Sequence, residues 1–468
     1  MAAKNNKEIN RREFLKQMGT AGAVGLGFEA CVPSGGNSSI IHQGNDDTGG
    51  MTYRIHPRSG DKVSLLGYGC MRWPFKSNPD GDGEVIDQDT VNSLVDYALS
   101  HGINYFDSAP SYGRGFSESA TGTALSRHPR ESYYIATKMS NHHLARTGLK
   151  GEALYRASTD MYRHSLEAFR TDYIDYYLLH NLGGETGMPF LNQRFFDSGV
   201  LDFLLKEREA GHIRHLGFSY HGDVKVFDYM LSLHDEIKWD FVQIQLNYVD
   251  FRHASGMNFN AEYLYEELQK RDIPAVIMEP LLGGRLASLT DHLNVRLKQY
   301  RPEDSIASWA FRFSGSFPGV LTVLSGMTYM EHLQDNLRTY SPLIPCTPKE
   351  LELLENTAQE MLRYPSVPCT ACEYCMPCPY GINIPGIFTH YNKCINEGNT
   401  PSSSQDENYR KERRAFLVGY DRSVPRLRQA SHCIGCNQCT PHCPQSIKIP
   451  EQLHRIDDFV EQLKQETI

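Results

Sequence analysis

The sequence lacks any long run of apolar residues and lacks an excess of positive charge. No stretch approaches the roughly 20 consecutive apolar residues that a membrane-spanning helix needs, so a membrane bundle is not indicated. Its 47 Lys and Arg residues are outnumbered by 56 Asp and Glu, which gives a formal net charge of −9. A nucleic-acid-binding face needs a basic stripe, so we expect small molecules or proteins as partners. With 40% hydrophobic and 22% charged residues over 468 positions, the chain can form a core and is not of the disordered type.

Cysteine is sparse outside one region near the C-terminus. Eight of the 12 cysteines fall there in two tight runs. The others are Cys31, Cys70, Cys346 and Cys394, which show no pairing pattern. Clustering at ligand spacing indicates metal binding and not a disulfide framework.

The N-terminus carries paired arginines, Arg11 and Arg12, followed by a weakly apolar, small-residue stretch over 18–30. This pattern resembles a twin-arginine export signal, predicted over 1–31, although an ordinary amphipathic start is the alternative. Residues 32–50 are rich in Gly, Ser, Asn and Asp and predict a flexible tether. We therefore expect export of the folded protein to a periplasmic or membrane-anchored location, with cytoplasmic residence as the alternative. Residues 28–30 fit a lipoprotein cleavage box poorly, so lipidation of Cys31 stays open.

Beyond residue 51, short apolar runs alternate with amphipathic stretches, as in parallel βα units. Helix-like stretches include 90–100, 152–169, 200–210 and 261–270. The predicted strands are 64–71, 103–109, 134–139, 173–180, 213–219, 241–248, 275–280 and 320–325. Eight strands favour an α/β fold of the closed (β/α)8 TIM-barrel type over 51–345. Residues 53–55 and the start of the first strand flank a turn, which predicts a hairpin closing the barrel floor.

Four polar residues lie at or just beyond the C-terminal ends of consecutive predicted strands, where this fold places its active sites. They are Asp107, Tyr112, Lys138 and His180. The segments around them read GINYFDSAPSYG over 102–113, IATK over 135–138 and LLH over 178–180. These segments resemble the signature of the aldo-keto reductases, and the resemblance covers most of 51–340.

The resemblance implies NAD(P)H-dependent reduction of an aldehyde or ketone. Hydride transfer to a carbonyl leaves negative charge on its oxygen, which needs a proton donor and polarising groups. Tyr112 would be the donor, Lys138 would lower its pKa, and Asp107 would hold Lys138. His180 would orient the substrate oxygen or share the proton-donor role. Singly, each residue has a structural explanation, such as a helix cap or a core histidine; jointly, in the family's order, they favour catalysis.

The resemblance also implies a set of cofactor contacts. Ser219 and Gln243 would bind the carboxamide of the nicotinamide, and Met278 stands where the family usually stacks a tyrosine. Gly326 and His332 stand where NADPH-preferring relatives often carry a lysine and an arginine, so NADP and NAD both stay open. The full predicted set is Gly69, Cys70, Met71, Asp107, Ser219, Gln243, Met278, Pro280, Leu281, Gly283, Gly326, Met327, Asp335 and Asn336, with the last two expected at the adenine.

The two cysteine runs predict two [4Fe–4S] clusters in a mainly α-helical ferredoxin-like domain over 365–468. The first run is Cys369, Cys372, Cys375 and Cys378, and the second is Cys433, Cys436, Cys439 and Cys443. The second has the bacterial ferredoxin spacing, in which the cysteine before proline crosses to the other cluster. We therefore expect Cys443 to join the first three cysteines, and Cys378 to join the second set. The first run is one residue shorter before Cys378, so Cys394 is the alternative ligand.

Zinc sites share the C-x2-C spacing, but three successive cysteines followed by Cys-Pro favour iron–sulfur. Helices are expected over 385–397, 407–419 and 450–464, the last with an apolar face formed by Ile449, Leu453, Ile456, Phe459 and Leu463.

Three functions remain open from the sequence. In the first, a carbonyl reductase has clusters that exchange electrons with a redox protein partner or with the nicotinamide. In the second, the clusters of an ordinary reductase only stabilise the appended domain or form a docking surface. The third possibility is a non-catalytic, nicotinamide-binding redox sensor or docking protein, which the intact set of four polar residues disfavours. The choice of substrate depends on loops over 182–199 and 247–260, so the sequence does not identify the substrate. The oligomeric state is open as well.

Overall fold

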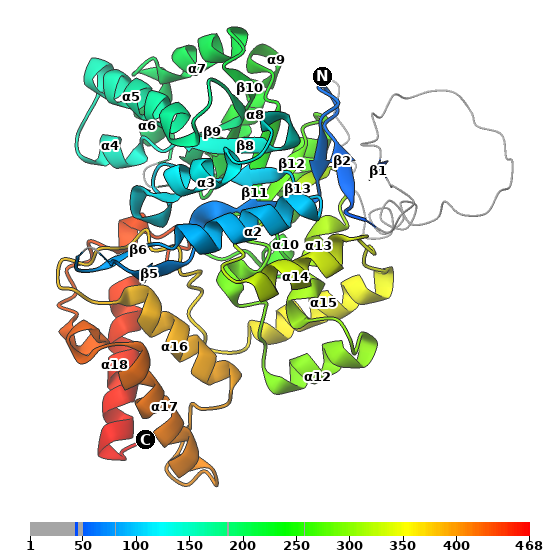
Figure 1. The fold of residues 1–468 in the computed structure, drawn as a ribbon. Coiled ribbons are helices and arrows are strands. Elements are labelled where there is room, and N and C mark those ends of the chain that lie inside the picture. Colours follow the sequence, from blue (N-terminus) through cyan, green and yellow to red (C-terminus); the bar gives the residue numbers. More distant parts are fainter. Residues whose placement is uncertain (1–42, 45–49, 80, 185–186, 257) are drawn as a thin grey trace, which may run out of the picture.

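Eight parallel strands close into a barrel, which confirms the predicted (β/α)8 fold (Figure 1). The computed structural model describes residues 43–44, 50–79, 81–184, 187–256 and 258–468. The predicted signal segment and most of the predicted tether lie outside these residues. The barrel strands are β4 (Leu66–Gly69), β7 (Tyr105–Asp107), β8 (Tyr134–Met139), β9 (Ile174–Leu182), β10 (Ile213–Tyr220), β11 (Phe241–Gln245), β12 (Ala275–Met278) and β13 (Val320–Ser325). Their order around the barrel is β10-β11-β12-β13-β4-β7-β8-β9.

Helices alternate with these strands along the chain and surround the barrel (Figure 1). None of the helices in the described part of the chain is both long and apolar enough to cross a membrane. The larger helices of this part are α2 (Gln88–Ser100), α3 (Ser117–Leu125), α5 (Gly151–Phe169), α7 (Val200–Glu209), α8 (Val224–Ser232), α11 (Ala261–Gln269), α12 (Asp291–Tyr300), α13 (Ile306–Gly315) and α14 (Met330–Tyr340). Shorter ones are α4 (His142–Arg146), α6 (Met188–Leu191), α9 (His234–Ile237) and α10 (Asp250–His253).

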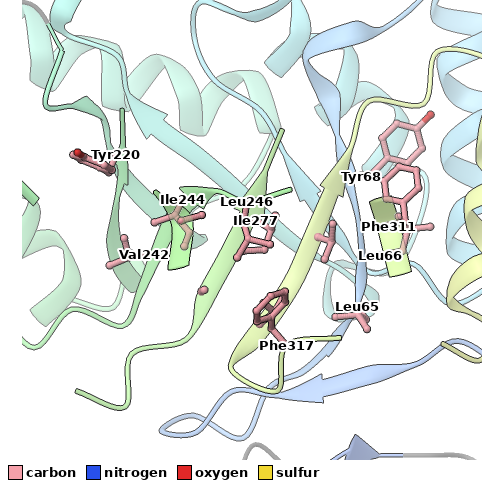
Figure 2. Close-up of a cluster of buried hydrophobic side chains, with 14 of the residues drawn as sticks. Leu65, Leu66, Tyr68, Tyr220, Val242, Ile244, Leu246, Ile277, Phe311 and Phe317 are labelled. Atoms are coloured by element: carbon pink, nitrogen blue, oxygen red, sulfur yellow. The ribbon is translucent and has the colours of Figure 1, made fainter. Parts of the chain in front are cut away.

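The strands are buried on both faces, which explains why they are mainly apolar runs without a strict alternation of apolar and polar residues. Tyr105, Tyr176 and Phe241 fill the interior of the barrel. Outward-facing side chains such as Ile244 pack in the layer between strands and helices, part of which Figure 2 shows. This arrangement leaves the ends of the strands as the place for polar side chains.

Two hairpins accompany the barrel. β2 (Tyr53–Ile55) pairs antiparallel with β3 (Lys62–Ser64), as predicted, and β1 (Gln43–Gly44) pairs with β2. The other hairpin, β5 (Phe75–Ser77) with β6 (Glu84–Ile86), was not expected. Its strands are short and largely exposed, so no apolar run marks them in the sequence.

The C-terminal region is helical and has a hydrophobic core of its own. α15 (Pro348–Met361) begins at a capping box between Thr347 and Glu350 and packs into the barrel core, beyond the predicted barrel end at 345. α16 (Ile384–Asn396), α17 (Tyr409–Ser423) and α18 (Ile449–Gln465) then form a separate bundle (Figure 1). On α18 the predicted apolar residues Ile449, Leu453, Ile456 and Leu463 are buried. Phe459 is only half-buried, and Val460, which was not predicted, is buried in addition.

Candidate active site

The polar residues predicted for catalysis gather at the mouth formed by the C-terminal ends of the barrel strands. Asp107 is the last residue of β7, Lys138 lies near the end of β8, and His180 lies near the end of β9. Because β7, β8 and β9 are neighbours in the barrel, their ends bring these side chains to one place. Tyr112 enters the same mouth from the loop after β7.

A buried ion pair holds the floor of this site. Lys138 Nζ donates to Asp107 Oδ1 at 2.5 Å and to the Ser108 carbonyl oxygen at 2.6 Å. The two side chains are only 1% and 3% exposed. Lys138 Nζ also lies 4.9 Å from the centre of the Tyr112 ring. Asp107, Lys138 and Tyr112 are thus in mutual contact.

The expected lowering of the Tyr112 pKa by Lys138 is not what this site produces. The pKa of Tyr112 lies well above its ordinary value, first because of burial and then because of the neighbouring Tyr374. The ammonium group of Lys138 lies over the ring of Tyr112 and is neutralised by Asp107. The phenol therefore stays protonated at neutral pH, which suits a proton donor.

His180 is held as a neutral imidazole. Burial, and next the positive charge of Lys138, lower the pKa of His180 well below its ordinary value. Its Nδ1 shares a hydrogen bond of 2.6 Å with Ser140 Oγ, and its ring centre lies 6.0 Å from that of Tyr112. Arg194 Nη2 donates to the His180 carbonyl oxygen at 2.6 Å and fixes the backbone. With Nδ1 occupied, Nε2 is the nitrogen that faces the reacting groups.

A cavity of about 480 Å³ extends across the mouth from Tyr112. Besides Tyr112, it is lined by eleven of the predicted cofactor contacts: Gly69, Met71, Asp107, Gln243, Met278, Pro280, Leu281, Gly283, Gly326, Asp335 and Asn336. Gln243 Oε1 is buried and has no hydrogen-bond partner among the described residues. The NH2 of a nicotinamide carboxamide would satisfy this oxygen, so the cavity fits that group.

Three predicted cofactor contacts are not among the residues that line this cavity. Cys70 is buried with its thiol against the Tyr68 carbonyl oxygen. Ser219 Oγ accepts a hydrogen bond from the Asn181 backbone at 2.9 Å, and the Met327 carbonyl accepts one from the Tyr68 hydroxyl at 2.5 Å. The side chains of Cys70 and Ser219 and the backbone of Met327 are thus engaged within the protein.

The end of the cavity that is predicted to hold the adenine carries two carboxylates, Glu331 and Asp335, of which Asp335 is paired with Arg338 at 2.8 Å. Glu331, His332 and Asp335 line it, and Arg72 is the one Arg or Lys that lines the cavity among the residues described. Arg72 is itself engaged, since its Nη2 donates to the Thr370 carbonyl oxygen at 2.9 Å. A Lys or Arg clamp for a 2′-phosphate is therefore lacking in the described lining.

The cysteines assemble in the crossed arrangement expected for two clusters. Cys369, Cys372, Cys375 and Cys443 line one small cavity, together with apolar residues such as Ile384 and Phe388. In the second set, Cys439 interacts electrostatically with Cys433, Cys378 and Cys436. Cys394 lies apart from this set, buried in α16 with its thiol 3.4 Å from His390 Nε2.

The donor sets suit four-iron clusters. Each set offers four thiols, the number that a [4Fe–4S] cluster takes from a protein. Within the described part of the chain, no group of three or more His, Cys, Asp or Glu side chains is arranged to hold a metal ion. A four-iron cubane is much larger than one ion and spaces its ligands more widely.

Both cysteine runs press against loops of the barrel mouth. A Cβ added to Gly283 would lie 2.3 Å from Thr370 Cα, and one added to Gly256 would lie 2.4 Å from the Gln445 carbonyl oxygen. Both glycines have positive φ. Thr370, Cys372, Tyr374, Pro444 and Gln445 consequently line the same large cavity as the barrel residues. The cysteine module forms one wall of the candidate active site.

Several residues of the site carry no signal that sequence reasoning used. Ser140, directly after β8, and Arg194, in a π-helical turn over Asn192–Phe196, support His180 from segments without a motif. His142, whose ring centre is 5.2 Å from that of His180, has no partner for either ring nitrogen among the described residues. Tyr374 falls between Cys372 and Cys375, at a position where the cysteine motif leaves the residue type open. Its place in the site follows from docking of the module on the barrel.

The fold and this site define a barrel oxidoreductase joined to an iron–sulfur module. Residues 65–357 match the family model described as the aldo/keto reductase family, and residues 368–448 match the model of a 4Fe-4S dicluster domain. The chain belongs to the aldo/keto reductase family and carries a 4Fe-4S domain.

Relatives match the barrel part of the chain. Protein tas of Escherichia coli strain K12 is 31% identical over 335 residues, which cover 62% of this chain and 93% of that protein. The uncharacterized oxidoreductase YqkF of Bacillus subtilis is 24% identical over 302 residues, covering 59% of this chain and 87% of YqkF. The solved structure of aldo-keto reductase AKR11C1 from Bacillus halodurans in its holo form is 20% identical, with a TM-score of 0.49, and covers 65% of this chain and 96% of its own.

Proposed function

We propose that this protein is a nicotinamide-dependent oxidoreductase that interconverts aldehydes or ketones and their alcohols. The observation that carries the proposal is the contact between the Lys138–Asp107 pair, Tyr112 and neutral His180 at the end of the cavity that fits a nicotinamide. When bound, the nicotinamide supplies or accepts hydride. The chain's own residues do the rest.

In the reducing direction, Tyr112 gives its phenolic proton to the carbonyl oxygen as the C=O π bond breaks. His180 presents Nε2 toward the same oxygen, because Ser140 occupies Nδ1. Donors held in place before the reaction stabilise the developing charge without reorganisation. Lys138 packs against the ring of Tyr112, and its ion pair with Asp107 places a permanent dipole next to that ring.

The acidic end of the cavity supports NADH over NADPH. A carboxylate such as Glu331 accepts a hydrogen bond from a ribose 2′-hydroxyl, whereas it repels a 2′-phosphate. Arg72, the cation among the described lining residues, is bound to the cluster loop through Thr370. We infer a preference for NADH.

Two [4Fe–4S] clusters would be held by Cys369, Cys372, Cys375 and Cys443, and by Cys378, Cys433, Cys436 and Cys439. Such clusters supply one-electron transfer. Cys372 lines the cavity that fits the nicotinamide, which supports a redox role over a purely structural one. Exposed Cys436 marks the side of the second set that a redox protein partner would reach. We also propose that the paired arginines Arg11 and Arg12 direct export of the folded protein.

The test is a screen with cluster-loaded protein purified without air. NADH and NADPH oxidation are followed against a panel of aldehydes and ketones, with Tyr112→Phe as the matched variant. We expect NADH oxidation that requires a carbonyl compound and the Tyr112 hydroxyl. NADH added anaerobically without a carbonyl compound should lower the visible absorbance of the clusters if they exchange electrons with it, and leave it unchanged if they are structural. Failure of both cofactors against the whole panel would refute the proposed activity.

A further inference from the structure

Tyr374 belongs to the cysteine module, yet its hydroxyl lies among the catalytic groups of the barrel. It sits between two residues of the first cysteine set, Cys372 and Cys375. Its oxygen is 3.5 Å from His180 Nε2, and it interacts with the hydroxyl of Tyr112. Its ring centre is 6.3 Å from that of His142. It also lines the cavity that fits the nicotinamide.

This position adjoins the place where a substrate oxygen must bind. Hydride transfer requires the carbonyl oxygen to reach both the proton donor Tyr112 and Nε2 of His180. Tyr374 approaches these same two groups from the cysteine module, which forms one wall of the cavity. A substrate oxygen that lies between Tyr112 and His180 is therefore within reach of the Tyr374 hydroxyl as well.

The loop that carries Tyr374 is held at several points. Arg72 Nη2 donates to the Thr370 carbonyl oxygen at 2.9 Å, and the Cα of Thr370 abuts Gly283 so closely that no Cβ fits there. Ala371 and Glu373, on either side of Cys372, both have left-handed φ angles, 51° and 64°. This backbone directs the side chain at 374 toward the barrel while Cys372 and Cys375 turn to their own cavity. The contact at His180 is long for a hydrogen bond, which leaves room for the hydroxyl to turn to a ligand.

We propose that Tyr374 is a further catalytic residue of the barrel's active site, supplied by the iron–sulfur module. Resting on the proposed function, this assigns the Tyr374 hydroxyl as a third donor to the substrate oxygen, beside Tyr112 and His180. Hydride goes from the nicotinamide to the carbonyl carbon, the π electrons move to oxygen, and the proton comes from Tyr112. Tyr374 keeps its own proton and donates a hydrogen bond to the developing alkoxide. The first cysteine set thereby becomes a structural requirement for full activity of the barrel.

The experiment compares Tyr374→Phe with Tyr380→Phe in full-length, cluster-loaded protein. Tyr380 belongs to the same loop but is 46% exposed, so it controls for general effects of removing a hydroxyl there. Loss of one hydrogen bond to a charged group costs roughly ten- to hundredfold in rate. We expect Tyr374→Phe to lower kcat by that factor with little change in KM, NADH affinity or iron content, and Tyr380→Phe to leave all four unchanged. Tyr374→His, which restores a donor, should recover part of the rate.

Unchanged kcat in Tyr374→Phe overturns the proposal. A faster variant overturns it too, because it shows that Tyr374 blocks the oxygen position. If Tyr374→Phe loses iron, its rate per cluster-loaded chain is compared with that of Tyr374→His: a higher rate in the histidine variant supports the donor role, and equal rates contradict it.

A spectroscopic arm separates this inference from the proposed activity. Tyr112→Phe removes the barrel partner of Tyr374. When Tyr374 is present, we expect this substitution to shift the electron paramagnetic resonance signal of the reduced cluster that the first cysteine set would hold. In a Tyr374→Phe background, we expect no shift. This measurement needs no substrate. An identical signal in all four proteins refutes the contact, whereas an inactive wild type on the carbonyl panel refutes only the proposed function.

Discussion

Replacing Lys138 with methionine tests the electrostatic design of the site. Methionine keeps most of the side-chain length but removes the charge that pairs with Asp107. The two side chains are 1% and 3% exposed, and Asp107 Oδ2 has no partner in the described part of the chain. Lys138→Met therefore leaves a buried carboxylate without compensation. Breaking such a pair costs about 3–5 kcal/mol of unfolding free energy.

The loss should depend on pH, because Asp107 can escape its penalty by taking up a proton. Burial already raises the pKa of Asp107 while Lys138 opposes that rise, so removing Lys138 raises it further. The unfolded carboxyl titrates near about 3.9. Between the pKa of Asp107 in the unfolded chain and its raised pKa in the folded variant, the folded variant binds one proton more than the unfolded chain. Its free energy of unfolding therefore falls as pH rises through this window. The slope is about 1.4 kcal/mol per pH unit inside this window.

The assay is urea unfolding at several pH values between 5 and 8, followed by tryptophan fluorescence. All three tryptophans of the chain, Trp73, Trp239 and Trp309, are buried in the barrel, at no more than 2% exposure. The signal therefore reports on the barrel and not on the cysteine module. We expect the deficit of Lys138→Met relative to wild type to be largest at pH 8 and to shrink toward pH 5.

Two controls make the result decisive. Adding Asp107→Asn to Lys138→Met should remove most of the pH dependence of the deficit, because the carboxyl that pairs with Lys138 is gone and only the weaker coupling of Lys138 to Glu118 remains. The exposed pair Arg163–Asp160, 3.0 Å apart with side chains 66% and 72% exposed, is the surface comparison, and Arg163→Met should cost less than about 1 kcal/mol. A deficit of equal size at pH 5 and pH 8 would refute the reasoning.

Four further expectations concern activity, cofactor, metal and export. Tyr112→Phe should lower kcat at least about a hundredfold with NADH affinity unchanged, and near-normal turnover would contradict its role as donor. Glu331→Lys should shift the ratio of kcat/KM for NADH over NADPH by at least about tenfold toward NADPH; an unchanged ratio would remove Glu331 from cofactor selection. Cys443→Ser and Cys433→Ser should each lower about eight irons per chain toward about four, with loss of different paramagnetic signals, whereas loss of the same signal would contradict the crossed assignment. Replacing Arg11 and Arg12 by lysine should retain the folded protein in the cytoplasm, as cell fractionation would show, and unchanged fractionation would mean that the pair is incidental.

The barrel could be predicted because its signals are local. Buried parallel strands such as β8 and β13 are mainly apolar runs, and their predicted limits coincide with the observed ones. The order of strands then places Asp107, Lys138 and His180 at one mouth without any knowledge of side-chain contacts. The hairpin β5–β6 escaped because its strands are short and exposed. A buried strand needs apolar residues and so leaves a recognisable pattern in the sequence, whereas these two strands have no buried residues.

The parts of the site that could not be predicted depend on contacts between distant segments. Tyr374 contacts His180 across 194 positions of sequence, and Arg194 reaches the His180 carbonyl from a π-helical turn that has no recognisable sequence pattern. The direction of the Tyr112 pKa shift was also wrong, since charge alone was considered and burial was not. A pKa depends on desolvation as well as on neighbouring charges, and desolvation of a loop tyrosine becomes visible only when the covering module is in place.

The close contacts at Gly256 and Gly283 provide a criterion for sorting other barrels of this family. Each glycine touches the backbone of one cysteine run, with φ values of 72° and 69° and no room for a Cβ. A barrel that bears a side chain at both positions cannot seat a module in this way, even if cysteines follow it in the chain. Glycine at both positions, together with two cysteine runs, would identify relatives whose iron–sulfur part is built into the mouth. Chains that fail the criterion would carry their clusters as a separate domain, with an active site that the barrel completes on its own.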